Sequence, residues 1–171
     1  GPIGTKKYIK EILDIFMGAY FNCYKKFDIS VYEVEKGIFV ENEDFCLESV
    51  PVEHGTPAVA YSFVVKEKNR LDKKKLEKLK IPNSPLIGEL SKGKIVEING
   101  KKVDGKKLLY KESGRKITFV MDTGKCDNAV KISNGSDILI CESTYSDEEK
   151  ETAKEYLHLT CVDAAEIAKK A

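Results

Sequence analysis

The stretch KITFVMDTGKCDNAVKISNGSDILICEST, residues 116–144, decides the fold of this chain. It opens with an apolar strand pattern that ends at Asp122 and continues with a short helical segment that ends at Gly135. A second apolar strand pattern, DILIC, follows and ends before Glu142, and two helical patterns complete the chain. Strands that alternate with helices in this order predict an α/β domain.

The residues before this stretch predict one helix and several strands. The segment 6–21 has helical periodicity and 58–65 (AVAYSFVV) predicts a strand apolar enough to be covered on both faces. Alternating patterns predict a strand over 28–35 and a hairpin over 37–55 that turns at residues 42–44. The predicted apolar face of the helix consists of Tyr8, Ile12, Ile15, Phe16 and Ala19.

The composition limits the class of protein. A chain of 171 residues with 42% hydrophobic residues can bury one core, and its net charge of +1 predicts neither nucleic-acid nor membrane affinity. No apolar run is long enough to span a bilayer, and there is no signal-peptide pattern. The five cysteines are odd in number and scattered without a C-x-x-C pair, which predicts reduced thiols and a cytoplasmic protein.

The charge is unevenly distributed along the chain. Residues 66–111 are rich in lysine and predict an insertion with a short charged helix over 72–79 and a small hairpin that turns at Asn99-Gly100. A solvated helix face and an electrostatic site for phosphates explain this composition equally well.

Polar residues with catalytic or metal-binding chemistry stand at the ends of the predicted elements. Asp122 and Glu142 each follow an apolar strand, His54 precedes the strand over 58–65, and His158 precedes a helix with Thr160 as its N-cap. Two histidines and a carboxylate are suitable zinc ligands, so these positions could converge on one metal site.

Each of these residues also has a purely structural interpretation. His54 can hydrogen-bond a loop, Asp122 a turn, Glu142 can be a charge at a helix N-terminus, and His158 can cap a helix C-terminus. Their spacing matches no short metal motif, so the residues alone leave both interpretations open.

Four segments together carry a resemblance to a known family. They are EHGTPAVAYSF (53–63), GRKITFVMDTGKCDNAV (114–130), GSDILICESTYSDEEKETAKEYLHLTCVDAAEIAKKA (135–171) and RLDKKKLEKLKIPNSPLIGELSKGKIV (70–96). Taken in their order along the chain, they resemble the second half of the ribonuclease Z family, tRNA 3′-processing endonucleases with a metallo-β-lactamase fold. GPIGT at the start resembles the turn that follows the family's first half, so we expect the C-terminal portion of such a protein.

The resemblance implies an αββα sandwich, of which residues 1–171 supply mainly the second half, with a protruding arm. It implies that His54, Asp122 and His158 are zinc ligands and that Asp122 bridges two zinc ions. It also implies that the intact protein removes the 3′ trailer of precursor tRNA. A hydroxide held between the metals attacks the phosphodiester in this family.

The same resemblance assigns the insertion at residues 66–111 to a tRNA-binding arm. Its lysines become candidates for contacts with the RNA backbone, and the segment after them corresponds to the clamp at the tip of the arm. The candidate substrate-binding residues are Lys73, Lys74, Lys75, Lys78, Lys80, Pro82, Asn83, Ser84 and Pro85.

The sequence departs from the family pattern at several places. The motif His-x-His-x-Asp-His, which supplies most other ligands, does not occur, so we expect partial metal occupancy or none, and no cleavage by this chain alone. Cys141 stands where the family has its proton-donating histidine. Met121 replaces a glycine, Leu159 replaces a serine, and Asn83-Ser84-Pro85 replaces the Gly-Pro of the arm.

Other functions stay open from the sequence. One is a non-catalytic RNA-binding module that keeps the arm and has lost the metal site. Another is a phosphodiesterase of the same fold that acts on a small substrate. An exposed half-core could also drive aggregation or dimerisation, and we expect a homodimer.

Overall fold

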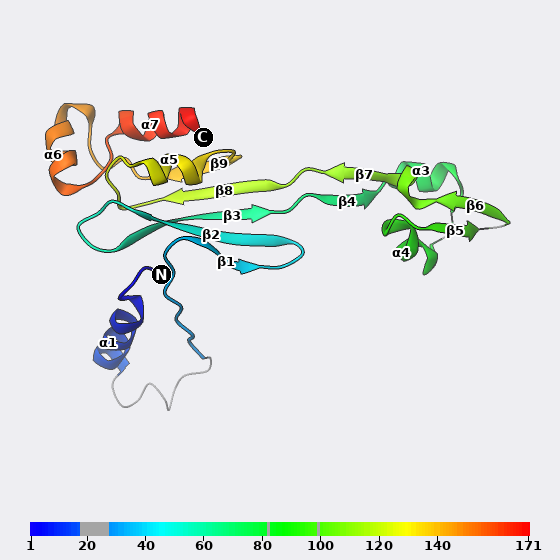
Figure 1. Cartoon of the computed structure of the whole chain (residues 1–171), viewed down its shortest axis with the longest axis horizontal. Coiled ribbons are helices and arrows are strands. Elements are labelled where there is room, and N and C mark those ends of the chain that lie inside the picture. The colour runs from blue at the N-terminus through cyan, green and yellow to red at the C-terminus, as the bar shows by residue number, and fades with distance from the viewer. Residues whose placement is uncertain (18–27, 82, 99) are drawn as a thin grey trace. The chain divides into compact units, whose positions relative to one another are not determined.

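The computed structural model describes residues 1–17, 28–81, 83–98 and 100–171 and divides into two compact units. Unit 1 comprises Gly1–Val65 together with Arg115–Ala171, and unit 2 comprises Lys66–Gly114. The chain is a mixed α/β protein, with helices and strands in both units (Figure 1).

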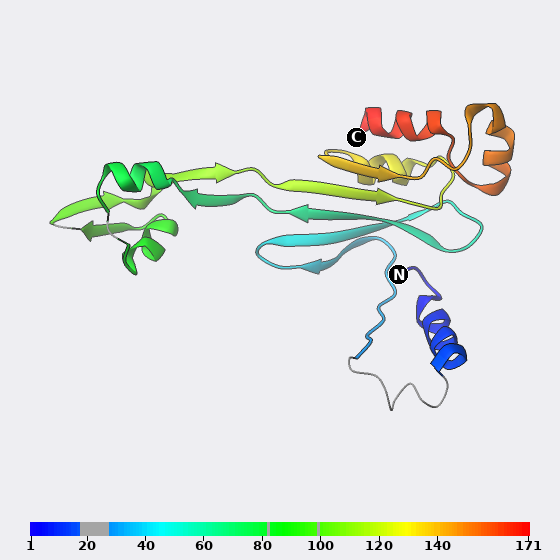
Figure 2. The ribbon, with the colours of Figure 1, turned by 180° about the vertical axis from the view of Figure 1, so that it is seen from behind.

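Unit 1 contains a five-stranded sheet in the order β1-β2-β3-β8-β9, which is easily followed from behind in Figure 2. All neighbours are antiparallel except β8 and β9, which are parallel and joined through a helix, so the predicted strand–helix–strand unit is confirmed. The hairpin between β1 and β2 turns at Asn42, whose Oδ1 accepts from the backbone N of Asp44 at 2.8 Å. The strands are β1 (Gly37–Glu41), β2 (Phe45–Val52), β3 (Ala58–Val65), β8 (Arg115–Val120) and β9 (Ile138–Cys141).

On one face of this sheet, α5 (Asp127–Ser133) packs against the strands and α7 (Cys161–Lys170) packs against α5. The helix α6 (Lys150–Tyr156), which continues the short 3-10 helix η3 (Asp147–Glu149), leads from the sheet to α7. α7 begins at the predicted N-cap, Thr160, which accepts from the backbone N of Asp163 at 3.1 Å and donates to that carboxylate at 2.9 Å. This reciprocal capping fixes where the last helix starts.

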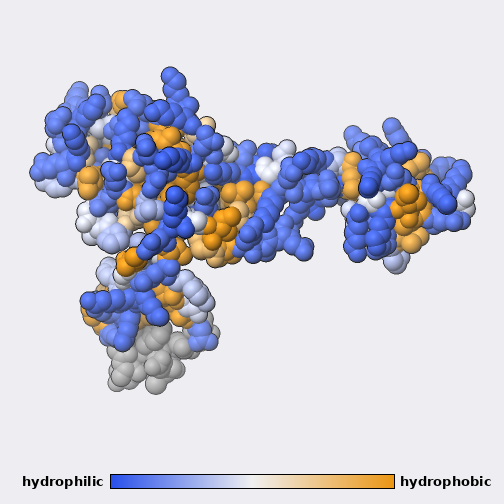
Figure 3. All heavy atoms as spheres, viewed as in Figure 1, coloured by the Kyte–Doolittle hydropathy of each residue, from blue (hydrophilic) through white to orange (hydrophobic). Residues whose placement is uncertain are grey.

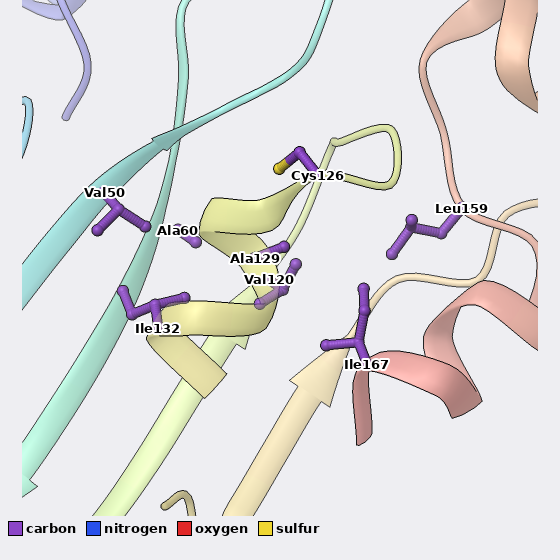
Figure 4. Packing of buried hydrophobic residues seen from close by; sticks show 8 residues of the cluster. All are labelled: Val50, Ala60, Val120, Cys126, Ala129, Ile132, Leu159 and Ile167. Carbon is purple, nitrogen blue, oxygen red and sulfur yellow. The ribbon is translucent and has the colours of Figure 1, made fainter. Parts of the chain in front are cut away.

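The core of unit 1 lies between the sheet and these helices (Figure 4). Val50, Ala60 and Val120 point from three strands toward Ala129 and Ile132 of α5. Leu159 and Ile167 close the cluster from the C-terminal segment, and both are fully buried.

On the opposite face of the sheet, Ser49 of β2 is buried and donates to Glu35 O at 3.1 Å, but no described helix or strand covers the side chains of β8 and β9. Strand register places Tyr61, Phe119 and Ile140 on this face, and Phe119 and Ile140 remain 40% and 44% exposed. Apolar side chains also reach the surface on β1, where Ile38, Phe39 and Val40 are exposed (Figure 3). The helices of this chain lie on one face of the 58–65 strand, and although the residues of β3 that point to the other face are not exposed, the prediction that both faces are covered stays a prediction.

The N-terminal helix α1 (Thr5–Met17) packs differently from its predicted face. Ile9 and Leu13 line a concavity with Ile29 and Val31 of the segment that follows, which selects this side of the helix for packing. Of the predicted face, Tyr8, Ile15 and Phe16 are exposed, only Ile12 is partly buried, and Ala19 lies outside the described residues.

The predicted strand over 28–35 is also wrong. This segment hydrogen-bonds the chain start instead of joining the sheet, and Val34 N donates to Gly1 O at 2.8 Å.

The described residues of unit 2 form two small two-stranded antiparallel sheets and two α-helices. The sequence predicted the helix α3 (Lys73–Lys78) and did not predict the helix α4 (Leu86–Ser91). The predicted hairpin is confirmed, although Asn99 at its turn lies outside the described residues. Leu90 and Leu108 are the most buried side chains of a small core. The elements are β4 (Lys68–Leu71), α3 (Lys73–Lys78), α4 (Leu86–Ser91), β5 (Ile95–Ile98), β6 (Lys101–Asp104), the 3-10 helix η2 (Gly105–Leu108) and β7 (Leu109–Glu112).

Within the described part of the chain, every helix is too short or too polar to cross a bilayer.

Candidate metal centre

His54 lies in the loop that joins β2 to β3, just after the last residue of β2. Its ring is partly buried, and its Nδ1 lies 3.3 Å from the backbone oxygen of Leu157. Because a carbonyl oxygen only accepts, this contact places the ring hydrogen on Nδ1 and leaves the Nε2 lone pair available for a metal ion.

Asp122 lies two residues after the end of β8 and has a left-handed backbone conformation, with φ of 48°. Aspartate tolerates this region better than most residues do. The turn after it is bonded on two sides, because Thr123 N donates to Glu142 Oε1 at 2.7 Å and Gly124 N donates to Glu53 O at 2.7 Å. The exposed carboxylate of Asp122 is thus carried by a turn with little freedom to move.

His158 follows the left-handed C-cap of α6 at Leu157, which has φ of 57°. Its Nδ1 lies 3.0 Å and 3.2 Å from the two carboxylate oxygens of Glu142. The side chain of Glu142 is only 6% exposed and that of His158 is 21% exposed. A carboxylate on Nδ1 fixes the ring orientation and leaves Nε2 for a metal, as in carboxylate–histidine–zinc sites.

The carboxyl group of Glu142 is buried, and the groups around it favour its ionised form. Burial alone raises the pKa of its carboxyl, but hydrogen bonds from Thr144, Thr123 and His158 outweigh burial and bring the pKa below its ordinary value. An ionised carboxylate therefore stands behind His158 at neutral pH, and it favours the imidazole tautomer with hydrogen on Nδ1.

The three residues converge in unit 1. His54, Asp122 and His158 each offer a ligand atom, and these atoms lie within 4.8 Å of one another. The two imidazole rings meet edge to face with centroids 5.1 Å apart. Two imidazoles and one carboxylate form a donor set that fits zinc.

Cys141 is not part of this group. Its side chain is partly buried and packs against the core cluster under the helices. Burial, followed by the nearby charge of Glu142, raises the pKa of the Cys141 thiol to about 11. The thiol therefore keeps its proton at neutral pH.

The candidate arm residues lie in unit 2. The candidate lysines of α3 and of the turn after it are exposed, although Lys75 Nζ donates to Lys107 O at 2.9 Å. Asn83 and Pro85 are exposed, Ser84 is partly buried, and Pro82 lies outside the described residues. Among the described atoms, Ser84 Oγ is buried without a hydrogen-bond partner.

Two features of the site were missed by sequence reasoning. Glu142 stood out only as a residue at the end of a strand, and its contact with His158 could not be foreseen from a separation of 16 residues. The backbone oxygens of Glu53 and Leu157 gave no signal, because any residue type supplies one.

Comparison with known proteins identifies relatives of this chain. No family model matches the chain. Ribonuclease Z of Lactobacillus gasseri is 36% identical over 172 residues, which are 99% of this chain and 54% of that protein. Ribonuclease Z of Methanosarcina acetivorans is 32% identical over 174 residues, covering 100% of this chain and 55% of that protein. This chain is homologous to ribonuclease Z.

The homology extends to the fold. The crystal structure of human tRNase Z, short form, aligns with 99% of this chain and 55% of its own, with a TM-score of 0.57 and 19% identity. This ribonuclease Z homologue therefore spans about half the length of the relatives it matches.

Proposed function

We propose that this chain forms part of a zinc-dependent endoribonuclease that removes the 3′ trailer of precursor tRNA. The observation that carries the proposal is the convergence of His54, Asp122 and His158 in a ribonuclease Z homologue. In a full site, zinc supplies an activated hydroxide and neutralises phosphate charge. The residues of this chain hold the metal, and Glu142 holds His158 in its ligating tautomer.

The bare sheet face supports an αββα sandwich as the complete fold. An apolar sheet face such as that of Phe119 and Ile140 is normally buried against another layer. The relatives carry almost as much sequence again as this chain matches. We propose that a second sheet covers this face and that this chain without it does not cleave tRNA.

Unit 2 is the proposed tRNA-binding arm. Asp72 caps α3, accepting from Lys74 N and Lys75 N, and the helix presents lysines to solvent. Ammonium groups on a short helix contact RNA phosphates without reading bases, so they position the substrate. The proposed contacts are Lys73, Lys74, Lys75, Lys78 and Lys80, with Pro82, Asn83, Ser84 and Pro85 at the clamp.

A chimera tests the function. This chain replaces the matching half of Lactobacillus gasseri ribonuclease Z, and cleavage of a precursor tRNA is followed by the length of the 3′ product. We expect cleavage at the trailer, its loss in Asp122→Asn, and its loss when residues 66–92 are deleted. A folded, zinc-loaded chimera without cleavage contradicts the proposal.

A non-catalytic RNA-binding module is the second candidate, because Cys141 packs into the core where the family has its proton donor. If this second candidate is right, the chimera binds precursor tRNA without cutting the RNA, and the chimera that also carries Cys141→His does the same. Activity on bis-p-nitrophenyl phosphate that survives deletion of residues 66–92 identifies the third candidate, a phosphodiesterase for small substrates.

Partners and location follow from the same proposal. We propose precursor tRNA as the partner, with a homodimer as the assembled state. The described cysteines Cys46, Cys126, Cys141 and Cys161 are free, which supports a reducing compartment such as the cytoplasm.

A further inference from the structure

The turn at residues 122–126, which carries Asp122, lies against the segment that carries His158. A Cβ at Gly124 would meet Leu157 Cα at 3.5 Å and Leu157 Cδ2 at 3.6 Å, and Leu157 directly precedes His158. These are ordinary van der Waals distances, so the two segments touch. A group that fixes this turn against that segment therefore also fixes the distance between two candidate ligands.

Lys125 belongs to this turn and makes such a link. Its Nζ lies 2.9 Å from Asp163 Oδ1 and 2.6 Å from Glu166 Oε2, both on α7. The same Asp163 carboxylate accepts from Thr160 Oγ1 at 2.9 Å, and Thr160 is the N-cap of α7, two residues after His158. One carboxylate therefore joins the turn to the start of the helix.

The two ion pairs of Lys125 differ in their exposure to solvent. The side chain of Asp163 is 14% exposed, whereas those of Lys125 and Glu166 are 43% and 48% exposed. Because salt screens exposed charges, the pair with Glu166 contributes little, and the shielded pair with Asp163 restrains the turn. Hydrogen bonds to Glu166 and Asp163 raise the pKa of the Lys125 ammonium group, which is therefore charged at neutral pH.

The same contacts disfavour a direct contact of Lys125 with substrate phosphate. The hydrogen bond from Lys125 lowers the pKa of the Glu166 carboxyl. Burial raises the pKa of the Asp163 carboxyl, but hydrogen bonds from Lys125 and Thr160 outweigh burial and lower it. One ammonium group and two carboxylates carry a net negative charge, which repels phosphate. Lys125 thus acts on the protein and not on the substrate.

We propose that Lys125 is a positioning residue, whose ammonium group holds the turn of Asp122 against the start of α7 and so sets the position of Asp122 relative to His158. The inference rests on the metal-site part of the proposed function. It goes beyond that proposal because it assigns the alignment of two ligands to an ion pair that contacts neither of them. This alignment precedes binding of an ion or a substrate, so it is measurable on the metal-free chain.

Amide hydrogen exchange of the metal-free chain tests this inference at Thr123 and Gly124. Their N–H groups donate to Glu142 and to Glu53 O, so their exchange reports opening of the turn. We expect Lys125→Met, which keeps the apolar stem, to speed this exchange about 3–10-fold at low salt. Exchange in β2 and β3 should stay unchanged, because exposed ion pairs contribute little to global stability. Lys125→Arg, which keeps the charge, should exchange within about twofold of the parent chain.

Salt and a matched control separate an ionic restraint from packing. In about 1 M sodium chloride, exchange of the parent chain should move toward that of Lys125→Met, because salt weakens the ion pairs. Lys131→Met on α5 removes an exposed pair with Asp127 at 3.9 Å and should leave both amides unchanged. The inference fails if Lys125→Met exchanges like the parent chain, if Lys131→Met has the same effect, or if β2 and β3 loosen by the same factor.

Zinc affinity distinguishes this inference from the proposed function. Competition with a chromophoric chelator should show zinc binding about 3–10-fold weaker in Lys125→Met than in the parent chain, because a looser turn must be ordered on binding. Faster exchange together with unchanged affinity overturns the positioning role. A parent chain that takes up no zinc contradicts the metal-site part of the proposed function, and the exchange rates then decide the role of Lys125.

Discussion

At the scale of single residues, Cys141 shows how burial sets reactivity. The thiol packs against the core, and its pKa is raised to about 11 by burial and by Glu142. Since the thiolate is the reactive form, Cys141 should react slowly at neutral pH. We expect iodoacetamide to modify the exposed Cys161 first, with the rate at Cys141 still rising between pH 9 and 11, as measured by mass spectrometry of the peptides. Equal rates at pH 7.5 contradict this prediction.

The same shift makes the stability of the fold depend on pH. The pKa of Cys141 is higher in the folded chain than the value of 9.0 for an exposed thiol, so the unfolded chain loses this proton first. The contribution of the protonated thiol is complete below pH 9 and decreases as the pH rises toward 11. Urea denaturation at several pH values should show a steeper loss above pH 9 in the parent chain than in Cys141→Ala, in which other titrating groups are unchanged.

At the scale of elements, the start of α7 depends on one hydroxyl. Thr160 is buried and caps the helix through Asp163, and its neighbours Leu159 and His158 belong to the core and to the candidate site. Thr160→Ala should lower the free energy of unfolding by about 1 kcal/mol, because a backbone N–H loses its acceptor. Thr160→Ser keeps the hydroxyl and should cost less than half as much. Urea denaturation measures both, and equal losses would show that the methyl group matters more than the cap.

Unit 2 has a close backbone approach that requires glycine. A Cβ at Gly105 would lie 2.5 Å from Leu90 O and 2.7 Å from Lys94 O, and neither carbonyl can move without breaking the small core. Gly105→Ala should destabilise unit 2 by roughly 1–3 kcal/mol, seen as faster amide exchange in β5 and β6.

Gly88 provides the matched control on α4. A Cβ there meets no atom within 4 Å, and alanine is the better helix former by about 0.5–1 kcal/mol. Gly88→Ala should therefore slow exchange in the same unit. If both substitutions have the same sign, backbone crowding at Gly105 is not what selects glycine.

At the scale of the whole molecule, the bare sheet face governs behaviour in solution. Ile138 and Ile140 on the edge strand β9 are 53% and 44% exposed, and exposed apolar sheet faces bind dyes and other chains. The double variant Ile138→Thr and Ile140→Thr should reduce ANS fluorescence and self-association, with a change in unfolding free energy within about 0.5 kcal/mol per site. Light scattering and ANS titration measure this, and Val162→Thr on α7 is the control.

Sequence patterns were sufficient where local periodicity decides the structure. The strand–helix–strand unit around Asp122, the hairpin at Asn42 and the helix after Thr160 were all predicted, since each depends on neighbouring residues. The strand over 28–35 and the packing side of α1 were not predicted correctly. Both depend on which other parts of the chain the segment packs against, and hydrophobic periodicity does not identify those parts.

By itself, the sequence determined the residue types of the site and the elements that carry them. Only the tertiary structure decided that His54, Asp122 and His158 meet, that Cys141 turns into the core, and that Glu142 joins the ligand segments. The physical reason is distance along the chain. The hydrogen bond from His54 to the backbone of Leu157 spans 103 residues. Local propensity does not encode such a contact, because it forms only after the strands have paired and the helices have packed on them.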